Sequence, residues 1–263
     1  MANRRLMAES EGTMSFQPDA RPGTMHPSTA EPPMSKLQIV IPLYPDVTHL
    51  DFTGPHQVLS RAPGAEVVVA SMGGADVAAE GLMFTGLADL AAIERCDILC
   101  VPGGLGATDA MLDEAFMREI RRLGAGATYL TSVCTGSLIL AAGGFLRGKR
   151  AACHWAWRDL LLPFGAIVDG GRVVRDGNII TGGGVTAGID FAFVLLAELA
   201  GEGFAQAVQL GLEYAPAPPF NAGRPELASA QVLAAYNRRM EPLMGVRRAA
   251  AEEAARRLQP AGA

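Results

Sequence analysis

The sequence predicts an α/β domain in which a mainly parallel β-sheet carries helices on both faces. Short apolar runs rich in β-branched residues alternate along the chain with longer segments of helical periodicity, and no internal repeat is found. Hydrophobic residues make up 49% of the 263 residues and charged residues 19%, which is typical of a well-buried globular domain. Strands that alternate with helices pair in parallel, because each helix returns the chain to the same edge of the sheet.

Strands are predicted wherever an apolar run is short and continuous, as in a sheet buried on both faces. These segments are residues 37–43, 66–71, 97–101, 129–133 and 150–154, with small strands between 81 and 90. Residues 172–181 are predicted to form a hairpin, since Asp176-Gly177-Asn178 supplies residues that favour a tight turn.

Helices are predicted between the strands from capping residues and from apolar residues at helical spacing. The first begins at Thr53-Gly54-Pro55, where a capping threonine precedes a proline in the first turn. The others run from Asp113 onward, over residues 135–142 and over residues 186–200.

The composition divides the chain into three parts. Residues 1–35 are rich in Pro, Ser, Thr and charge and lack an apolar signal region, so a disordered leader is expected. Residues 36–225 should form the folded domain, with an irregular proline-rich stretch at 216–223. Residues 226–263 should form a C-terminal helical tail, basic and peripheral from Arg238 onward.

Charge and hydropathy narrow the class of protein. The formal net charge of −5 argues against a nucleic-acid partner, which usually requires a basic face. No apolar stretch reaches the roughly 20 residues that a membrane span needs, so no membrane partner and a cytoplasmic location are expected.

The four cysteines do not form a disulfide framework in a chain of this length. Cys96 and Cys100 flank a strand-like run and are expected to be buried small hydrophobic residues. Their spacing also allows a zinc half-site, but no second half-site follows, so no metal is expected.

Cys134 is the candidate nucleophile, because it stands where a hydrophobic strand runs directly into a helix. Ligands of open α/β sheets bind beyond the carboxyl ends of the strands, and a side chain at such a sharp turn is exposed to the cleft and often strained. The helix N-terminus favours a thiolate, which predicts a lowered pKa. A buried structural cysteine is the alternative, although Gly136 favours the tight turn because a larger residue would block close packing there.

Two further segments contain candidate site residues. Pro102-Gly103-Gly104 follows a buried strand, and its N–H groups could point into the cleft as an oxyanion hole, although a plain loop is the alternative. Asp51 follows the first strand and would lie near the same edge of the sheet. Considered alone, Asp51 fits a helix-capping or surface carboxylate better than a catalytic one.

Together these segments resemble the PfpI-type branch of the class I glutamine amidotransferase-like superfamily. The resemblance spans residues 37–223 and rests on the segments YPDVTHLDFTGP, VPGGLGA, TSVCTGSLILAAGGFLRGKRA, HWAW, RVVRDGNIITGGGVTAGIDF and QLGLEYAPAPPFNAG. The stretch from CTGSLILAAGGFL through HW is shared with amidotransferase-like transcription regulators. LDFTGP and EYAPAPPFNAG are more specific and are similar to members that hydrate isonitriles.

The resemblance implies a flavodoxin-like three-layer sandwich that forms homodimers and uses no metal or organic cofactor. It implies Cys134 as the nucleophile, Asp51 as the essential acid and N–H donors at Gly104 and Thr135. Many members have a histidine after the cysteine, or a glutamate in place of Asp51. Thr135 and Asp51 in this chain point away from the protease-like and deglycase-like members.

His154 is a further candidate, since some relatives place a histidine from this region near the thiol. A hydrogen-bonded structural role is equally compatible with its position. Cys153 would point to the opposite face of a regular strand and is interpreted as core.

The activity that the resemblance implies is hydration of a small-molecule isonitrile to an N-substituted formamide. One alternative is another cysteine-dependent hydrolase or a glyoxalase-type enzyme on the same scaffold. A second is a non-enzymatic stress or ligand-sensing module related to the regulators. Those regulators carry a C-terminal helix-turn-helix domain, and the residues after Gly223 are expected to be too few for one.

Overall fold

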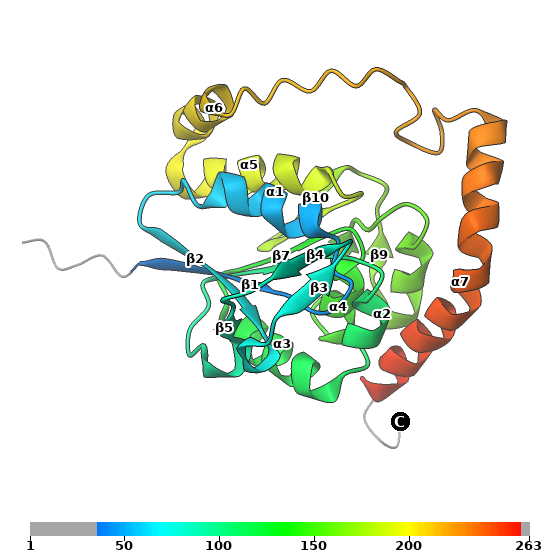
Figure 1. Ribbon diagram of the computed structural model, residues 1–263, viewed down its shortest axis with the longest axis horizontal. Helices are drawn as coiled ribbons and strands as arrows, with labels where there is room; N and C mark the ends of the chain where they lie inside the picture. The colour runs from blue at the N-terminus through cyan, green and yellow to red at the C-terminus, as the bar shows by residue number, and fades with distance from the viewer. Residues whose placement is uncertain (1–35, 259–263) are drawn as a thin grey trace, which may run out of the picture. The chain divides into compact units, whose positions relative to one another are not determined.

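The computed structural model describes residues 36–258, and the predicted leader lies outside these residues. A seven-stranded sheet with the order β10-β11-β7-β6-β1-β2-β5 forms the centre of the fold (Figure 1). Its strands are β1 (Leu37–Pro42), β2 (Ala65–Ser71), β5 (Ala88–Asp89), β6 (Ile98–Val101), β7 (Tyr129–Val133), β10 (Val173–Asp176) and β11 (Ile179–Gly182). All neighbouring strands pair in parallel except β10 and β11, which form the predicted hairpin.

Helices cover both faces of the sheet, which confirms the predicted fold class. In Figure 1, α1 and α5 lie on one face, and α3 and α4 lie on the other. The α-helices are α1 (His49–Leu59), α2 (Ala107–Ala110), α3 (Glu114–Gly126), α4 (Gly136–Ala142), α5 (Ala187–Ala200), α6 (Glu202–Gly211) and α7 (Ala230–Arg257). No described helix is both long and apolar enough to cross a membrane.

Short elements complete the connections between the main strands and helices. β3 (Val77–Ala79) and β4 (Leu82–Phe84) form an antiparallel pair, and β8 (Arg150–Ala151) pairs in parallel with β9 (Ile167–Val168). Three 3₁₀ segments are η1 (Met72–Gly74), η2 (Leu90–Ala92) and η3 (Arg158–Phe164).

The first helix begins earlier than its sequence predicts. Thr48 occupies the N-cap position, so α1 begins at His49 and contains Pro55 in its interior. The Thr53 hydroxyl does not cap the helix; it donates 2.9 Å to the carbonyl of His49, one turn back. Asp51 consequently lies in the first turn of α1 and not in the loop before it.

The predicted strand at residues 150–154 is also too long. Only Arg150 and Ala151 form a strand, because the N–H of Ala152 donates to the side-chain hydroxyl of Thr181 at 2.8 Å. Cys153 and His154 therefore belong to an irregular segment, in which side chains need not alternate between two faces.

The C-terminal helix is part of the folded core at its second half, so the expectation of a peripheral tail is wrong there. Four alanines and one arginine of this half are buried: Arg247, Ala250, Ala251, Ala254 and Ala255. Small side chains let α7 approach the body closely. Arg257 fixes its end by donating 3.0 Å to the Leu112 carbonyl and 3.2 Å to Glu114.

Candidate active site

Three neighbouring strands deliver the predicted site residues to one edge of the sheet. β7, β6 and β1 lie side by side, and each is followed by a segment that contains candidate residues. β1 leads to Asp51, β6 leads to Gly103 and Gly104, and β7 leads to Cys134. β1 and β6 also flank the point at which the strand order reverses, where open α/β sheets bind their ligands.

Cys134 occupies a strained turn between β7 and α4, as the sequence predicts. Its φ of 56° lies in the left-handed region, which non-glycine residues rarely adopt. The Cys134 N–H donates 3.1 Å to the carbonyl of Gly182 on β11. A Cβ atom on Gly136 would lie 2.2 Å from the carbonyl oxygen of Val101, so only glycine fits after this turn.

Asp51 is completely buried and is held by the glycine loop. Its Oδ2 accepts a hydrogen bond of 2.9 Å from the N–H of Gly103. Its Oδ1 is buried and has no hydrogen-bond partner within residues 36–258. A surface or capping role, which Asp51 alone would suggest, is therefore wrong.

Burial raises the pKa of Asp51 to about 7. The hydrogen bond from Gly103 and the interaction with the Cys134 side chain lower this pKa, and the charge of Glu80 adds to the rise. A carboxyl group with this pKa exists in both protonation states near neutrality, which is what a group that accepts and donates protons needs.

Thr135 connects the nucleophile turn to the glycine loop. Its hydroxyl accepts 2.8 Å from the N–H of Gly104 and donates 3.0 Å to the carbonyl of the same residue. The Gly104 N–H, expected to be free for a substrate, is thus occupied by Thr135. Gly103 has no room for a side chain, because a Cβ would lie 2.5 Å from the backbone nitrogen of Thr135.

The Cys134 thiol differs from the predicted thiolate. Its pKa is raised well above the ordinary value, first by burial and then by the charges of Asp51 and Cys153. Hydrogen bonds from the backbone and side chain of Thr135 act in the opposite direction. Cys134 is 6% exposed, so loss of solvation exceeds the effect of the short helix α4. The resting site holds a neutral thiol beside a carboxyl group.

Tyr44 is a residue near the site that sequence reasoning missed. Its hydroxyl donates 2.7 Å to the carbonyl of Pro102 and so connects the end of β1 to the glycine loop. Burial and the charges of Asp51 and Cys134 raise the pKa of Tyr44, which places it close to both groups. Its position directly after a buried strand was a signal that could have identified it.

Cys153 is 4% exposed and belongs to the hydrophobic core, as predicted, and Cys153 and His154 also line a pocket of about 260 Å³. Nδ1 of His154 accepts 3.3 Å from the N–H of Ala156. Burial and the charge of Arg247 lower the pKa of His154 to about 4. His154 is therefore neutral at neutral pH.

Two residues of α7 that the sequence alone does not identify contact the segment around His154. The Tyr236 ring stacks on His154 with 6.4 Å between centroids and lies 4.9 Å from Trp155. The Arg247 guanidinium carbon lies 3.9 Å from the centre of the Trp157 ring. Nothing in the local sequence around either residue signals this contact, because it depends on where α7 docks.

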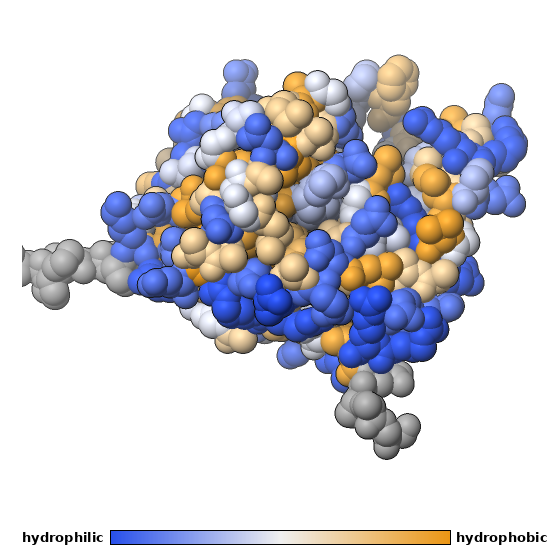
Figure 2. Space-filling model, turned by 60° about the horizontal axis from the view of Figure 1, so that its bottom comes forward, coloured by the Kyte–Doolittle hydropathy of each residue, from blue (hydrophilic) through white to orange (hydrophobic). Residues whose placement is uncertain are grey.

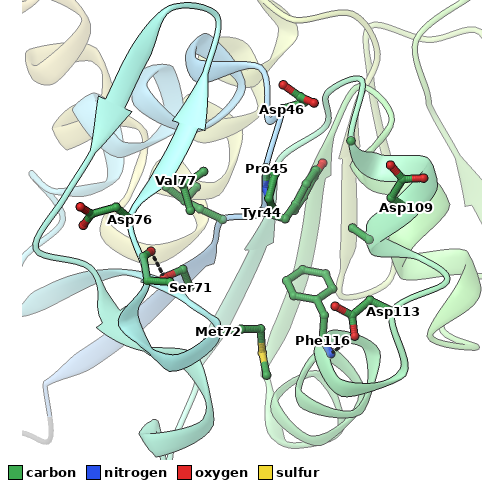
Figure 3. A pocket seen from close by; sticks show the side chains of 14 residues that line it. Tyr44, Pro45, Asp46, Ser71, Met72, Asp76, Val77, Asp109, Asp113 and Phe116 are labelled. Atoms are coloured by element: carbon green, nitrogen blue, oxygen red, sulfur yellow. Dashed lines mark hydrogen bonds between the residues drawn. The ribbon is translucent and has the colours of Figure 1, made fainter.

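A separate pocket of about 460 Å³ opens beside the ends of β1 and β2 (Figure 3). Tyr44, Met72 and Phe116 line it together with acidic residues such as Asp46 and Asp109. Neither the candidate nucleophile nor its carboxyl partner lines it. Within residues 36–258, no three His, Cys, Asp or Glu side chains are grouped closely enough to hold a metal ion.

The chain belongs to the DJ-1/PfpI family, whose model matches residues 37–198. The protein is similar, more particularly, to the isonitrile hydratase of Pseudomonas putida, with 48% identity over 226 residues. That match covers 84% of this chain and 98% of the relative. A second relative is protein dj-1beta of Drosophila melanogaster, 32% identical over 68% of this chain and 97% of that protein.

Solved structures confirm the family fold. A ThiJ/PfpI family protein from Pseudomonas syringae superposes with a TM-score of 0.80 and 38% identity, covering 89% of this chain and 98% of that one. Drosophila melanogaster DJ-1beta superposes with a TM-score of 0.61 and 29% identity, covering 70% of this chain and 100% of that one. The flavodoxin-like arrangement predicted from the sequence is thus confirmed.

Proposed function

We propose that this protein hydrates isonitriles to N-substituted formamides, with Cys134 as the nucleophile and Asp51 as the group that transfers protons. The observation that supports this most is the 48% identity to an isonitrile hydratase over nearly the whole of that relative. The buried pair of Cys134 and Asp51 supplies the groups that the reaction needs.

The first step adds the thiol to the terminal carbon of the isonitrile R–N≡C. This carbon forms a bond to the Cys134 sulfur and also receives a proton, so the product is the thioimidate R–N=CH–S–Cys. Asp51 accepts the thiol proton as the C–S bond forms and delivers it to the same carbon. Covalent catalysis of this kind divides one difficult hydration into two easier additions.

The second step adds water to the thioimidate carbon. The water proton passes to the nitrogen through the Asp51 carboxyl, which gives a tetrahedral adduct with sulfur, oxygen and nitrogen on one carbon. The C–S bond then breaks, the hydroxyl proton returns to sulfur, and R–NH–CHO leaves. The net reaction consumes one isonitrile and one water and regenerates the thiol.

The protonation states of the site suit this chemistry. The reaction needs both a nucleophilic sulfur and a proton, and a neutral thiol beside a carboxyl of pKa about 7 supplies the two together. Because the groups interact strongly, they titrate as a coupled pair. The N–H of Thr135 stabilises negative charge on sulfur while the proton is being transferred.

Formation of the formamide tests the proposal directly. Purified, reduced protein is incubated with cyclohexyl isocyanide, and N-cyclohexylformamide is quantified by liquid chromatography alongside Cys134→Ala. We expect product from the wild type and none from the variant above background. An acid quench should leave wild-type protein heavier by one isonitrile. Absence of formamide from folded wild-type protein overturns the proposal, and small aldehydes and amides tested in parallel would then identify a glyoxalase or hydrolase.

We also propose that the protein is a cytoplasmic homodimer. The β3–β4 hairpin exposes two adjacent large apolar side chains, Leu82 by 50% and Met83 by 61%, which contact with a second copy of the chain would bury. Light scattering after size exclusion measures the mass, and we expect twice the 27.5 kDa of the chain. Replacement of both side chains by serine should lower that mass to the monomer value.

A further inference from the structure

Arg247 has a mostly buried side chain whose guanidinium is only partly engaged by the protein. The residue is 7% exposed. Within residues 36–258 its guanidinium makes one hydrogen bond, 3.5 Å from Nη2 to the Leu105 carbonyl, and forms no salt bridge. A guanidinium has five N–H donors. The nitrogens of Arg247 without a protein partner are not fully buried, so their donors are available to an anion that enters from solvent.

The guanidinium is held in a fixed place at the edge of the Cys134 site. It lies over Trp157, where the attraction of a cation to an aromatic face holds it at 3.9 Å. Leu105, which accepts its hydrogen bond, directly follows Gly104 of the glycine loop. Arg247 thus contacts both the glycine loop and the segment that follows His154.

The helix presents one continuous stripe of residues to this region. Tyr236, Met240, Met244, Arg247 and Ala251 recur at spacings of four, four, three and four, which places them on one face of α7. All five are buried or partly buried, and the positions next to the first four are exposed. In Figure 2, hydrophobic and polar residues are interspersed along the side of the molecule that carries α7.

Hydrogen bonds place Arg247 near the nucleophile turn. Arg247 bonds to Leu105, and the preceding residue, Gly104, donates to the hydroxyl of Thr135, the residue after Cys134. Burial lowers the pKa of Arg247, and the charges of Cys134, Tyr236 and Asp109 partly restore it. Arg247 therefore lies close enough to Cys134 for their charges to interact.

Arg247 provides a positive charge in this region with which an anionic ligand can pair. At neutral pH the Cys134 thiol and His154 are neutral, and Asp51 is about half protonated. Among Cys134, Asp51, His154, Tyr236 and Arg247, only Arg247 carries a positive charge. When Cys134 attacks the terminal carbon, the N-substituent of the isonitrile points away from sulfur, toward the surrounding walls.

We propose that Arg247 binds a carboxylate on the N-substituent, so that isocyano carboxylates are the preferred substrates. This inference rests on the proposed isonitrile hydration and names the substrate class of the same site. A planar guanidinium suits a carboxylate, because two parallel N–H···O bonds form between them. Arg247 is then a specificity-determining residue that plays no part in the bond changes at carbon.

A matched pair of substrates tests the proposal. Isocyanoacetate and ethyl isocyanoacetate carry the same reacting carbon and differ in the negative charge. We expect the wild type to favour the carboxylate in kcat/KM by at least about tenfold, the effect of one charge-assisted contact. Arg247→Met, which keeps an apolar stem over Trp157, should remove this preference mainly through KM and change the ester less than about twofold.

Two further variants serve as controls. Arg247→Lys retains the charge without the planar fork and should keep part of the preference, which also covers the case that Arg247→Met fails to fold. Arg248→Met removes the exposed arginine next in sequence and should leave the preference at the wild-type value. Melting temperatures of all variants establish that each one folds.

Product binding supplies a readout that does not depend on turnover. In Cys134→Ala, N-formylglycine should bind more tightly than its ethyl ester, and the additional replacement Arg247→Met should abolish the difference. The inference is overturned if Arg247→Met loses activity equally toward both isonitriles, or if Cys134→Ala binds the two formamides equally. Either result leaves the proposed hydration reaction standing. If the wild type forms no formamide from isocyanoacetate, from its ethyl ester or from cyclohexyl isocyanide, the proposed function itself is overturned.

Discussion

The N–H of Gly103 donates a 2.9 Å hydrogen bond to Oδ2 of Asp51, and the other carboxyl oxygen is buried without a hydrogen-bond partner among residues 36–258. The bond fixes the orientation of the carboxyl, and burial places its pKa near 7. The two residues are 52 positions apart, so this contact exists only because β1 and β6 lie side by side.

Asp51→Asn should lower isonitrile turnover by at least about 100-fold, because an amide keeps the shape of the side chain but cannot transfer a proton. Formamide formation under saturating substrate measures the effect. The amide oxygen can still accept from Gly103, so the melting temperature at pH 5 should stay within a few degrees of the wild type. Near-full turnover in this variant contradicts the assigned role.

The same carboxyl should make the stability of the protein depend on pH. The pKa of Asp51 rises from 3.8 to about 7 on folding, so the folded state binds a proton more tightly. The stability gained by this proton is fully present below pH 3.8 and is lost as the pH rises through 7. A shift of this size corresponds to about 4 kcal/mol between those limits.

Urea unfolding at pH 5 and pH 8 measures this dependence, with Asp51→Asn as the reference that lacks the titrating group. The variant should gain stability relative to the wild type as the pH rises. Equal changes in the two proteins would show that the carboxyl is already ionised at pH 5.

Alkylation should report the environment of Cys134. Burial and the charge of Asp51 raise the pKa of the thiol, so iodoacetamide should react slowly at pH 7 and faster as the pH rises. Asp51→Asn removes the negative charge and should speed alkylation at pH 8 while it slows turnover. Cys134→Ala measures the background alkylation of the other three buried cysteines. Slower alkylation of Asp51→Asn than of the wild type would contradict this prediction.

Gly103→Ala should impair activity and stability together. Its Cβ would lie 2.5 Å from the Thr135 nitrogen and 2.8 Å from Asp51 Oδ2, so the loops must separate. We expect a loss of about 1–3 kcal/mol and a strong fall in turnover. Gly126→Ala, in α3 with nothing within 4 Å, is the matched control and should be neutral or slightly stabilising.

Local sequence was sufficient to predict the nucleophile turn. The strand that ends at Val133, the cysteine and Gly136 are contiguous, and the steric reasons for their order act within a few residues. The hairpin at 173–182 was predictable for the same reason, since its turn residues and its strands are adjacent.

Properties that depend on distant segments were predicted less well. The predicted direction of the Cys134 pKa shift was wrong, because the position before a helix is a local property, whereas burial and the charge of Asp51 depend on segments distant in sequence. The pairing of Asp51 with Gly103 needs the order of strands in the sheet, which the pattern of one segment does not contain. Arg247 lies more than a hundred residues beyond Cys134, and its contacts follow from the docking of α7.

The position of α7 at the end of the described chain has a consequence for synthesis and for divergence. During translation the strands of the sheet and the turn at Cys134 are synthesised before Tyr236 and Arg247, so the segment with the nucleophile precedes the helix that packs near it. Substitutions along the inward stripe of α7 do not change the sequence of the strand, turn and helix around the sulfur. Substitutions in α7 can therefore change which molecules the site binds, while the residues that carry out the reaction at the thiol stay the same.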